Sequence, residues 1–284
     1  MSSAVETKNY NDRVTVSIRD FVADVRLDRA DKRNALDPAM FDAIAKAGQD
    51  LVSNREIRAV VLSGNGSSFC AGLDFASFQA MAGGDAVAAN DKKSSENAGA
   101  MQPGAITHMA QQICWVWQEV PVPVVAAIQG HALGGGMQLA LGVDIRVAHP
   151  TTQFAMREAH WGLIPDMTGT LMLSRLVRDD VAKDLVFSAR IISGTEAHEL
   201  GVVTRLSDTP LDVAMQIARE IAERSPDAVR GAKELINRLS NAGAAEHFAE
   251  ERRIIHKLIG KQNQVEAVTS NFEKRPAIFV APSV

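Results

Sequence analysis

The sequence predicts an α/β fold in which helices cover a central sheet. Residues 14–18 and 22–27 alternate apolar and polar side chains across a short turn, as the strands of a half-buried β-hairpin do. Residues 59–63 and 124–128 are apolar almost throughout and rich in β-branched side chains, which is typical of strands buried on both faces. Stretches of helical periodicity separate these runs, so we expect a layered α/β core.

The elements between the strands follow from capping residues and from apolar spacing. Asp37 and Pro38 form a typical N-cap and N1 pair, and apolar residues then recur at helical spacing, which predicts a helix over residues 38–54. Residues 82–104 are mostly small and polar and predict a mobile surface loop of the kind that walls binding sites. Helical periodicity resumes over residues 106–119.

A run of three glycines is the most informative feature of the chain. Gly134, Gly135 and Gly136 follow the buried strand 124–128 and open the apolar segment 137–142, which a second strand over 144–148 follows. Glycines at a helix start leave backbone N–H groups free for a ligand oxygen that gains negative charge. Because Glu158 and Asp166 come soon afterwards, we predict an enzyme that stabilises an enolate and moves protons beside it.

The chain reads as helical from Arg175 to its end. Gly, Pro, Ser or Asn signals bound helical segments near residues 181–187, 194–200, 211–223, 226–239, 244–258 and 264–272. We therefore divide the chain into a core over residues 1–207, which carries the site, and a helical region over residues 208–284. Helices with exposed apolar faces commonly dock against another subunit, so we expect this region to serve oligomerisation.

Composition excludes several classes of partner. The 284 residues carry a net charge of −4, which gives no general attraction to nucleic acid or to anionic membranes. The longest apolar run, residues 120–128, is too short to span a bilayer. Cys70 and Cys114 lie in apolar surroundings without metal or redox spacing, so we expect reduced core thiols and a cytoplasmic protein. No HxxxH or HExxH spacing predicts a metal site.

Four segments in register resemble the crotonase family, also called the enoyl-CoA hydratase/isomerase superfamily. They are Asn34-Ala35-Leu36, Phe69-Cys70-Ala71-Gly72-Leu73-Asp74, Gly130-His131-Ala132-Leu133-Gly134-Gly135-Gly136 and Phe272-Glu273-Lys274-Arg275-Pro276. The likeness covers residues 14–279. It implies a crotonase-like spiral of repeated ββα units with a helical C-terminal region, assembled as a homotrimer or hexamer.

The resemblance also implies the substrate and its contacts. The family acts on thioesters of coenzyme A and binds the thioester carbonyl with two backbone N–H groups, which here fall on Leu73 and Gly135. Coenzyme A then enters as part of the substrate, with no separate cofactor. The contacts implied for its nucleotide and pyrophosphate are Lys32, Arg33, Ala35, Ala71, Asp74 and Lys274.

The acids indicate which reaction to expect. Enoyl-CoA hydratases carry two glutamates, and here the second is Glu158 whereas the first position is Gln138, whose amide cannot exchange a proton near neutral pH. Asp166, eight residues after Glu158, resembles the dienoyl-CoA isomerase branch, although that branch has an aspartate where Gln138 stands. We expect a double-bond shift in an enoyl- or dienoyl-CoA, with hydration as the alternative and an inactive acyl-CoA-binding scaffold as a second alternative.

Each candidate residue also has a purely structural interpretation. Glu158 would be a surface acid, Asp166 would cap the helix that starts near Thr168, and Gln138 would satisfy a neighbouring carbonyl. We interpret Trp161 as a wall of the acyl pocket and the nearby histidines His131 and His160 as structural.

Overall fold

The computed structural model describes residues 7–75, 77 and 99–281, and these form two sheets surrounded by helices. The larger sheet holds seven strands in the order β1-β2-β3-β4-β5-β7-β10, and the smaller holds three in the order β6-β8-β9. Their bounds are β1 Thr7–Tyr10, β2 Val14–Arg19, β3 Val22–Leu27, β4 Ala59–Gly64, β5 Val124–Ile128, β6 His131–Leu133, β7 Ile145–Ala148, β8 Gln153–Ala155, β9 Ile192–Ser193 and β10 Arg205–Leu206.

The described helices lie between the strands and at the C-terminal end. They are η1 Ala30–Lys32, α1 Pro38–Ser53, α4 Met109–Glu119, α5 Gly135–Leu141, η3 Glu158–Trp161, α6 Gly169–Ser174, α7 Asp179–Ser188, α8 Gly194–Glu199, α9 Pro210–Ala222, α10 Pro226–Ser240, α11 Ala244–Leu258 and α12 Gln262–Glu273. None of the described helices is both long enough and apolar enough to pass through a bilayer.

The chain winds between the two sheets. The antiparallel strands β1 to β3 come first, and the larger sheet continues with parallel pairing from β3 through β4, β5 and β7 to β10. After β5 the chain adds β6 to the smaller sheet and then forms α5, and after β7 it adds β8 to the same smaller sheet. Two strands in different sheets followed by a helix form one repeated unit, as predicted.

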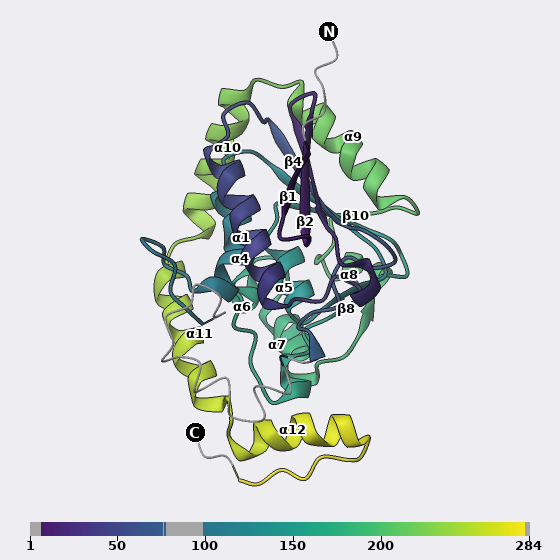
Figure 1. Cartoon of the computed structure of the whole chain (residues 1–284), viewed down its shortest axis with the longest axis vertical. Coiled ribbons are helices and arrows are strands. Elements are labelled where there is room, and N and C mark those ends of the chain that lie inside the picture. The colour runs from purple at the N-terminus through teal and green to yellow at the C-terminus, as the bar shows by residue number, and fades with distance from the viewer. Residues whose placement is uncertain (1–6, 76, 78–98, 282–284) are drawn as a thin grey trace.

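The alternation of side chains along β4 explains why the core has two layers. Val60 and Leu62 belong to the main hydrophobic cluster, together with the buried faces of α1 and α4. Val61 points to the opposite face, where it packs against α9 residues such as Ala214 and Ala218. Figure 1 shows the strands standing between α1 and α4 on one side and α9 on the other. The strand is therefore apolar throughout because both its faces are buried.

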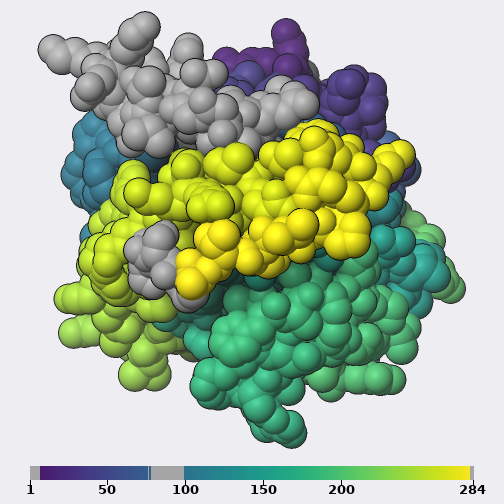
Figure 2. Space-filling view, turned by 90° about the horizontal axis from the view of Figure 1, so that it is seen from below, coloured from purple at the N-terminus to yellow at the C-terminus, as the bar shows by residue number. Residues whose placement is uncertain are grey.

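The helices after residue 208 differ in how closely they join the core. Helix α9 contacts β4, β5 and β7, so this first helix of the predicted C-terminal region forms a layer of the core. Helix α12 and the tail after it lie across the face seen in Figure 2, beside α11. A role of residues 208–284 in oligomerisation stays a prediction.

Helix α10 is fastened to the core by a buried lysine. Lys233 is 8% exposed, and its Nζ donates to Trp117 O at 3.0 Å, Val122 O at 3.0 Å and Asp144 Oδ2 at 2.7 Å. Burial lowers the pKa of Lys233, and the Asp144 carboxylate opposes this shift. These contacts join α10, the end of α4 and the start of β7.

Replacing Lys233 by methionine should therefore destabilise the fold. Lys233→Met leaves Asp144 and two carbonyl groups without their donor, and removing one partner of a buried ion pair costs about 3–5 kcal/mol. Urea unfolding followed by circular dichroism measures the loss. The matched control is Lys183→Met, because Lys183 pairs with Asp179 on the surface and should cost about 0–1 kcal/mol. Similar losses in both variants would contradict the prediction.

The structure shifts several predicted boundaries by one to three residues, and the start of one helix has a clear cause. The helix expected over 106–119 begins at Met109, because His108 is its N-cap and forms a reciprocal capping box with Gln111. Histidine is not a common N-cap residue, which is why the sequence pattern suggested an earlier start. Most of the predicted loop over 82–104 lies outside the described residues. Cys70 and Cys114 are free and buried, as predicted.

Candidate active site

Two segments predicted to contact coenzyme A run side by side. Ala71 N donates to Arg33 O at 2.9 Å, Leu36 N to Gly72 O at 2.8 Å, and Asp74 N to Leu36 O at 3.0 Å. In this parallel bridge between Leu36 and Leu73, the N–H of Leu73 itself points away from Leu36. The pairing of the two segments therefore does not use the Leu73 N–H, which is the predicted oxyanion donor.

The second predicted donor lies close to the first. A side-chain carbon on Gly72, where φ is +91°, would lie 2.5 Å from Leu133 O and 3.7 Å from Gly135 N. Only glycine accepts both the positive φ and this close approach. Among the described residues, neither Leu73 N–H nor Gly135 N–H has a hydrogen-bond acceptor. Two unsatisfied donors therefore lie near each other, as an oxyanion hole requires.

Glu158 lies beside these donors, at the first residue of η3. It is 8% exposed, so the interpretation as a surface acid is wrong. A side-chain carbon on Gly134, the residue before the Gly135 donor, would lie 3.3 Å from Glu158 Oε1. Burial raises the pKa of Glu158 to about 7. Its Oε2 is buried and has no hydrogen-bond partner among the described residues.

Gln138 links Glu158 to the backbone of the residues that follow Asp166. Its Nε2 donates to Glu158 Oε1 at 2.6 Å, and its Oε1 accepts from Met167 N at 2.9 Å and Gly169 N at 3.0 Å. The interpretation that Gln138 only satisfies a carbonyl is therefore wrong. A glutamine suits this position because it donates to a carboxylate and accepts from two N–H groups at once.

Asp166 is the first residue of the turn over residues 166–169, which leads into α6. Its interpretation as a helix cap is wrong, because Thr168 is the N-cap of α6 and no side chain caps this helix. Part of the Asp166 side chain remains exposed, but burial raises its pKa to about 8, and the carboxylates of Glu251 and Glu158 add to this shift. Two acids with raised pKa values thus lie near each other, which is typical of proton-transfer sites.

Glu251, on α11, was missed by the sequence analysis. Its Oε2 accepts from Gln111 Nε2 at 2.9 Å and Thr168 N at 3.2 Å, and its Oε1 accepts from Thr170 Oγ1 at 3.0 Å. A signal was present, because Phe248, Glu251 and Ile255 share one face of α11 and all three are buried. An acid within an apolar stripe of a helix indicates a buried polar contact.

The remaining predicted coenzyme A contacts have mixed surroundings. Lys32, Arg33 and Lys274 are exposed. Asp74 Oδ2 accepts from Arg29 Nη1 at 2.7 Å, and the same Nη1 donates to Ala35 O at 3.1 Å. Arg29 therefore holds the two parallel segments together. Contacts of these residues with coenzyme A stay a prediction.

An aromatic cluster lies at the end of η3, against α12. The ring centroid of Trp161 lies 6.3 Å from those of Phe75 and Phe272, and the latter two are 6.1 Å apart. Phe75 follows the Leu73 donor by two residues, and Phe272 belongs to α12. His160 packs edge-on against Trp161, and His131 Nδ1 lies 2.8 Å from Ser68 Oγ. Apolar surface from three parts of the chain therefore meets here.

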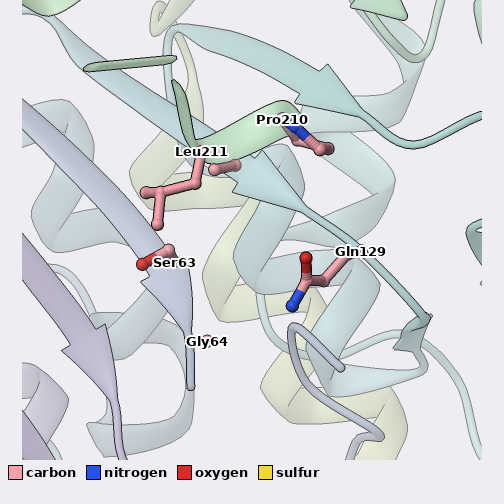
Figure 3. A pocket seen from close by; sticks show the side chains of 6 residues that line it. Ser63, Gly64, Gln129, Pro210 and Leu211 are labelled. Carbon is pink, nitrogen blue, oxygen red and sulfur yellow. The ribbon is translucent and has the colours of Figure 1, made fainter. Parts of the chain in front are cut away.

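Two hollows in the described part of the chain lie apart from these groups. A cavity of about 30 Å³ between the ends of β4 and β5 and the start of α9 is lined by Ser63, Gly64, Gln129 and Leu211, among others, and has room for a water but not for a substrate (Figure 3). A hollow of about 310 Å³ lies between η3, α12 and the tail, with His160, Asn271 and Arg275 in its lining. Neither lining includes Glu158 or Asp166.

The variant Gln138→Glu tests the link that Gln138 makes between Glu158 and the turn that begins at Asp166. A glutamate keeps the acceptor for Met167 N–H and Gly169 N–H but brings a second carboxyl group against Glu158. We expect the pKa of Glu158 to rise further, because two adjacent carboxylates resist double ionisation. When an acid has a higher pKa in the folded state than in the unfolded state, the folded protein becomes less stable as pH rises. Relative to the parent protein, the unfolding free energy of the variant should therefore fall by about 1–3 kcal/mol more at pH 8 than at pH 5.

Urea unfolding at the two pH values measures this difference. The control is Gln216→Glu, because Gln216 also donates to a glutamate, Glu220 at 2.9 Å, but on the exposed surface of α9. It should show almost no pH-dependent loss. An equal loss for Gln138→Glu at pH 5 and pH 8 would contradict the proposed coupling.

Comparison with known proteins finds relatives in a single enzyme family. The family model for enoyl-CoA hydratase/isomerase matches residues 17–281. A Mycobacterium leprae protein named as a probable enoyl-CoA hydratase is 30% identical over 257 residues, covering 90% of this chain and 93% of that protein. The mitochondrial methylglutaconyl-CoA hydratase of Mus musculus is 29% identical, covering 88% of this chain and 76% of that protein.

Solved structures share the architecture. An enoyl-CoA hydratase/isomerase from Pseudoalteromonas atlantica has a TM-score of 0.79 and 26% identity, covering 94% of this chain and all of the other. One from Mycobacterium paratuberculosis has a TM-score of 0.81 with 22% identity, covering 91% and 98%, and this likeness shows the fold alone. The predicted crotonase-like spiral is therefore confirmed.

Proposed function

The chain belongs to the enoyl-CoA hydratase/isomerase family, and we propose that it shifts a double bond in an unsaturated acyl-CoA thioester. The observation that carries this proposal is a pair of acids with raised pKa values, Glu158 and Asp166, beside two unsatisfied backbone donors. In this proposal coenzyme A enters only as part of the substrate, and the enzyme needs no further cofactor.

The reaction begins with the carbonyl oxygen between Leu73 N–H and Gly135 N–H. One carboxylate removes a proton from the acyl chain, and the electron pair moves toward the carbonyl to form an enolate whose oxygen accepts both N–H bonds. The other acid returns a proton at a different carbon, and the double bond takes its new place. Charge and protons balance, because one acid gains the proton that the other gives up.

The raised pKa values suit this exchange. With ordinary values near 4, both acids would be ionised at neutral pH and neither could donate. Values of about 7 and about 8 keep a proton on the pair near neutral pH while leaving the other acid able to accept one. Gln138 supports this arrangement by bonding to Glu158 Oε1, which leaves Oε2 for the substrate.

The acyl group is proposed to lie against the aromatic cluster of Phe75, Trp161 and Phe272. Phe75 follows the Leu73 donor by two residues, and Trp161 is the last residue of η3, which Glu158 begins. Lys32, Arg33 and Lys274 are exposed cations suited to the phosphates of coenzyme A. We further propose a homotrimer or hexamer, in which the helical region after residue 208 contributes to subunit contacts, and a cytoplasmic location.

Hydration is the alternative, favoured by the names of relatives such as the methylglutaconyl-CoA hydratase. In that reaction Glu158 or Asp166 would activate one water that Gln138 helps to hold. However, Gln138 Oε1 already accepts from Met167 N and Gly169 N, and Nε2 already donates to Glu158, which leaves only one amide N–H for a water. A catalytically inactive acyl-CoA-binding scaffold is the remaining alternative.

One assay separates the three functions. The purified protein is incubated with crotonyl-CoA and, separately, with a 3,5-dienoyl-CoA, while ultraviolet absorbance is recorded. An isomerase produces a growing 2,4-dienoyl band, and this is the expected result. A hydratase removes the enoyl band of crotonyl-CoA, and a scaffold binds the thioesters without changing either spectrum. The second and third outcomes would each overturn the proposed isomerisation.

A further inference from the structure

The turn of residues 166–169 is held from two opposite sides. Met167 N and Gly169 N both donate to Gln138 Oε1 on α5, whereas Thr168 N, between them, donates to Glu251 Oε2 on α11 at 3.2 Å. Successive N–H groups can point in opposite directions here because Thr168 has a φ of +72°. A β-branched residue rarely adopts this conformation, which costs about 1–3 kcal/mol and persists only where the surroundings impose it.

Glu251 is built to receive hydrogen bonds. It is 4% exposed, and its three bonds, from Gln111 Nε2, Thr168 N and Thr170 Oγ1, are all donated to it. Donors aimed at both oxygens stabilise a carboxylate anion. Gln111 is in turn fixed, because Arg252 Nη1 donates to its Oε1 at 2.8 Å. The buried Glu251 carboxylate is therefore held against Thr168, which follows Asp166 by two residues.

The charged groups around the two acids come from several elements. Asp166 experiences the carboxylates of Glu158, from η3, and Glu251, from α11. His247 Nε2 lies 3.6 Å from Glu251 Oε1 and 2.8 Å from Thr170 Oγ1, and the Glu251 carboxylate raises the pKa of His247. His108, the buried N-cap of α4, has its pKa lowered to about 4 by burial and is neutral near pH 7. Of the two site acids, Asp166 is the one whose pKa Glu251 raises.

From this geometry we propose that Glu251 is a positioning residue for Asp166. It holds the turn that carries Asp166 through Thr168 N–H, and it places a fixed negative charge beside that side chain, which favours the protonated form of Asp166. The inference rests on the proposed function, since it concerns how the acid pair is prepared for proton transfer. It adds the C-terminal helix α11 to the set of elements on which the chemistry depends.

Two substitutions separate the two parts of this role. Glu251→Gln keeps an oxygen for Thr168 N–H and Gln111 Nε2 and offers an N–H to Thr170 Oγ1, so it removes the charge and preserves the bonds. Glu251→Ala removes both. The control is Glu250→Gln, one residue earlier on α11, where the glutamate is exposed and pairs with Arg253.

The kinetic readout is the pH dependence of kcat and KM. In Glu251→Gln we expect kcat to change by less than about tenfold, KM to stay constant, and the limb of the profile near pH 8 to move to lower pH. In Glu251→Ala we expect kcat to fall roughly 100-fold, as for a misplaced catalytic group. Glu250→Gln should leave the profile unchanged.

A second readout does not require turnover. Carbon-13 labelling of aspartate carboxyl groups gives an NMR titration, in which the Asp166 resonance is identified by its loss in Asp166→Asn. Its midpoint should move to lower pH in Glu251→Gln and stay in place in Glu250→Gln. An unmoved midpoint in Glu251→Gln overturns the proposal, even where Glu251→Ala fails to fold. If the protein converts no acyl-CoA, the proposed function fails while this titration still decides the role of Glu251.

Discussion

Glu158→Gln is expected to lower kcat by about 10²–10⁴-fold, the contribution typical of a general acid or base. Glutamine has the same shape, and its oxygen still accepts the hydrogen bond that Gln138 Nε2 donates to Oε1 of Glu158. The fold and the oxyanion donors therefore remain, and KM should change little. Stopped-flow or steady-state absorbance assays with the acyl-CoA that the protein converts measure the loss.

Stability distinguishes this catalytic loss from a folding defect. Because burial raises the pKa of Glu158 to about 7, its ionisation opposes folding as pH rises through that value. Glu158→Gln removes this cost, so the variant should be more stable than the parent at pH 8 and equally stable at pH 4. The control is Glu119→Gln. Glu119 also accepts from a glutamine amide, Gln112 Nε2, but it lies at the C-terminal end of α4. Its replacement should leave kcat unchanged. Retention of full kcat in Glu158→Gln would remove Glu158 from the mechanism.

Gly72→Ala is expected to have the second large effect. The new methyl group would lie 2.5 Å from Leu133 O, so β6 and the start of α5 must move away from Leu73. The two backbone donors then separate, and loss of one oxyanion donor typically lowers kcat by about 10²–10³-fold. Binding of free coenzyme A, which lacks the thioester carbonyl, should be unchanged. Isothermal titration calorimetry measures the affinity for free coenzyme A, and a steady-state assay measures kcat.

The control for Gly72→Ala is Gly104→Ala. Gly104 also has a positive φ, of +71°, but a side-chain carbon there would meet no atom within 4 Å. Both variants carry the conformational strain of alanine at positive φ, roughly 1–3 kcal/mol, and only Gly72→Ala displaces the donors. Equal losses of kcat in the two variants would show that general destabilisation, rather than the oxyanion hole, accounts for the effect.

The parts of the fold that the sequence predicted are those with strong local patterns. The apolar runs of β4 and β5 and the N-cap at Asp37 gave elements close to the observed ones. The glycine run ending at Gly136 placed the start of α5. Short strands such as β6 and β9, of three and two residues, have too few side chains to show a period, and they were missed.

The parts of the site that were missed depend on contacts between distant segments. Gln138 was found by its position after the glycines, but its bonds to Glu158, Met167 and Gly169 follow from three-dimensional packing. Glu251 lies on a helix that was assigned to subunit contacts, and its bond to Thr168 N joins residues 83 positions apart. Local patterns carry no information about such pairs.

The placement of Glu251 has a consequence for the order in which the molecule becomes functional during its synthesis. The strands, the glycine run and both site acids come before α11 in the sequence, so they leave the ribosome first. A nascent chain of that length contains Glu158 and Asp166 but lacks Glu251, the acceptor for Thr168 N–H. The last part of the chain to be translated therefore supplies the carboxylate that accepts from Thr168 N–H.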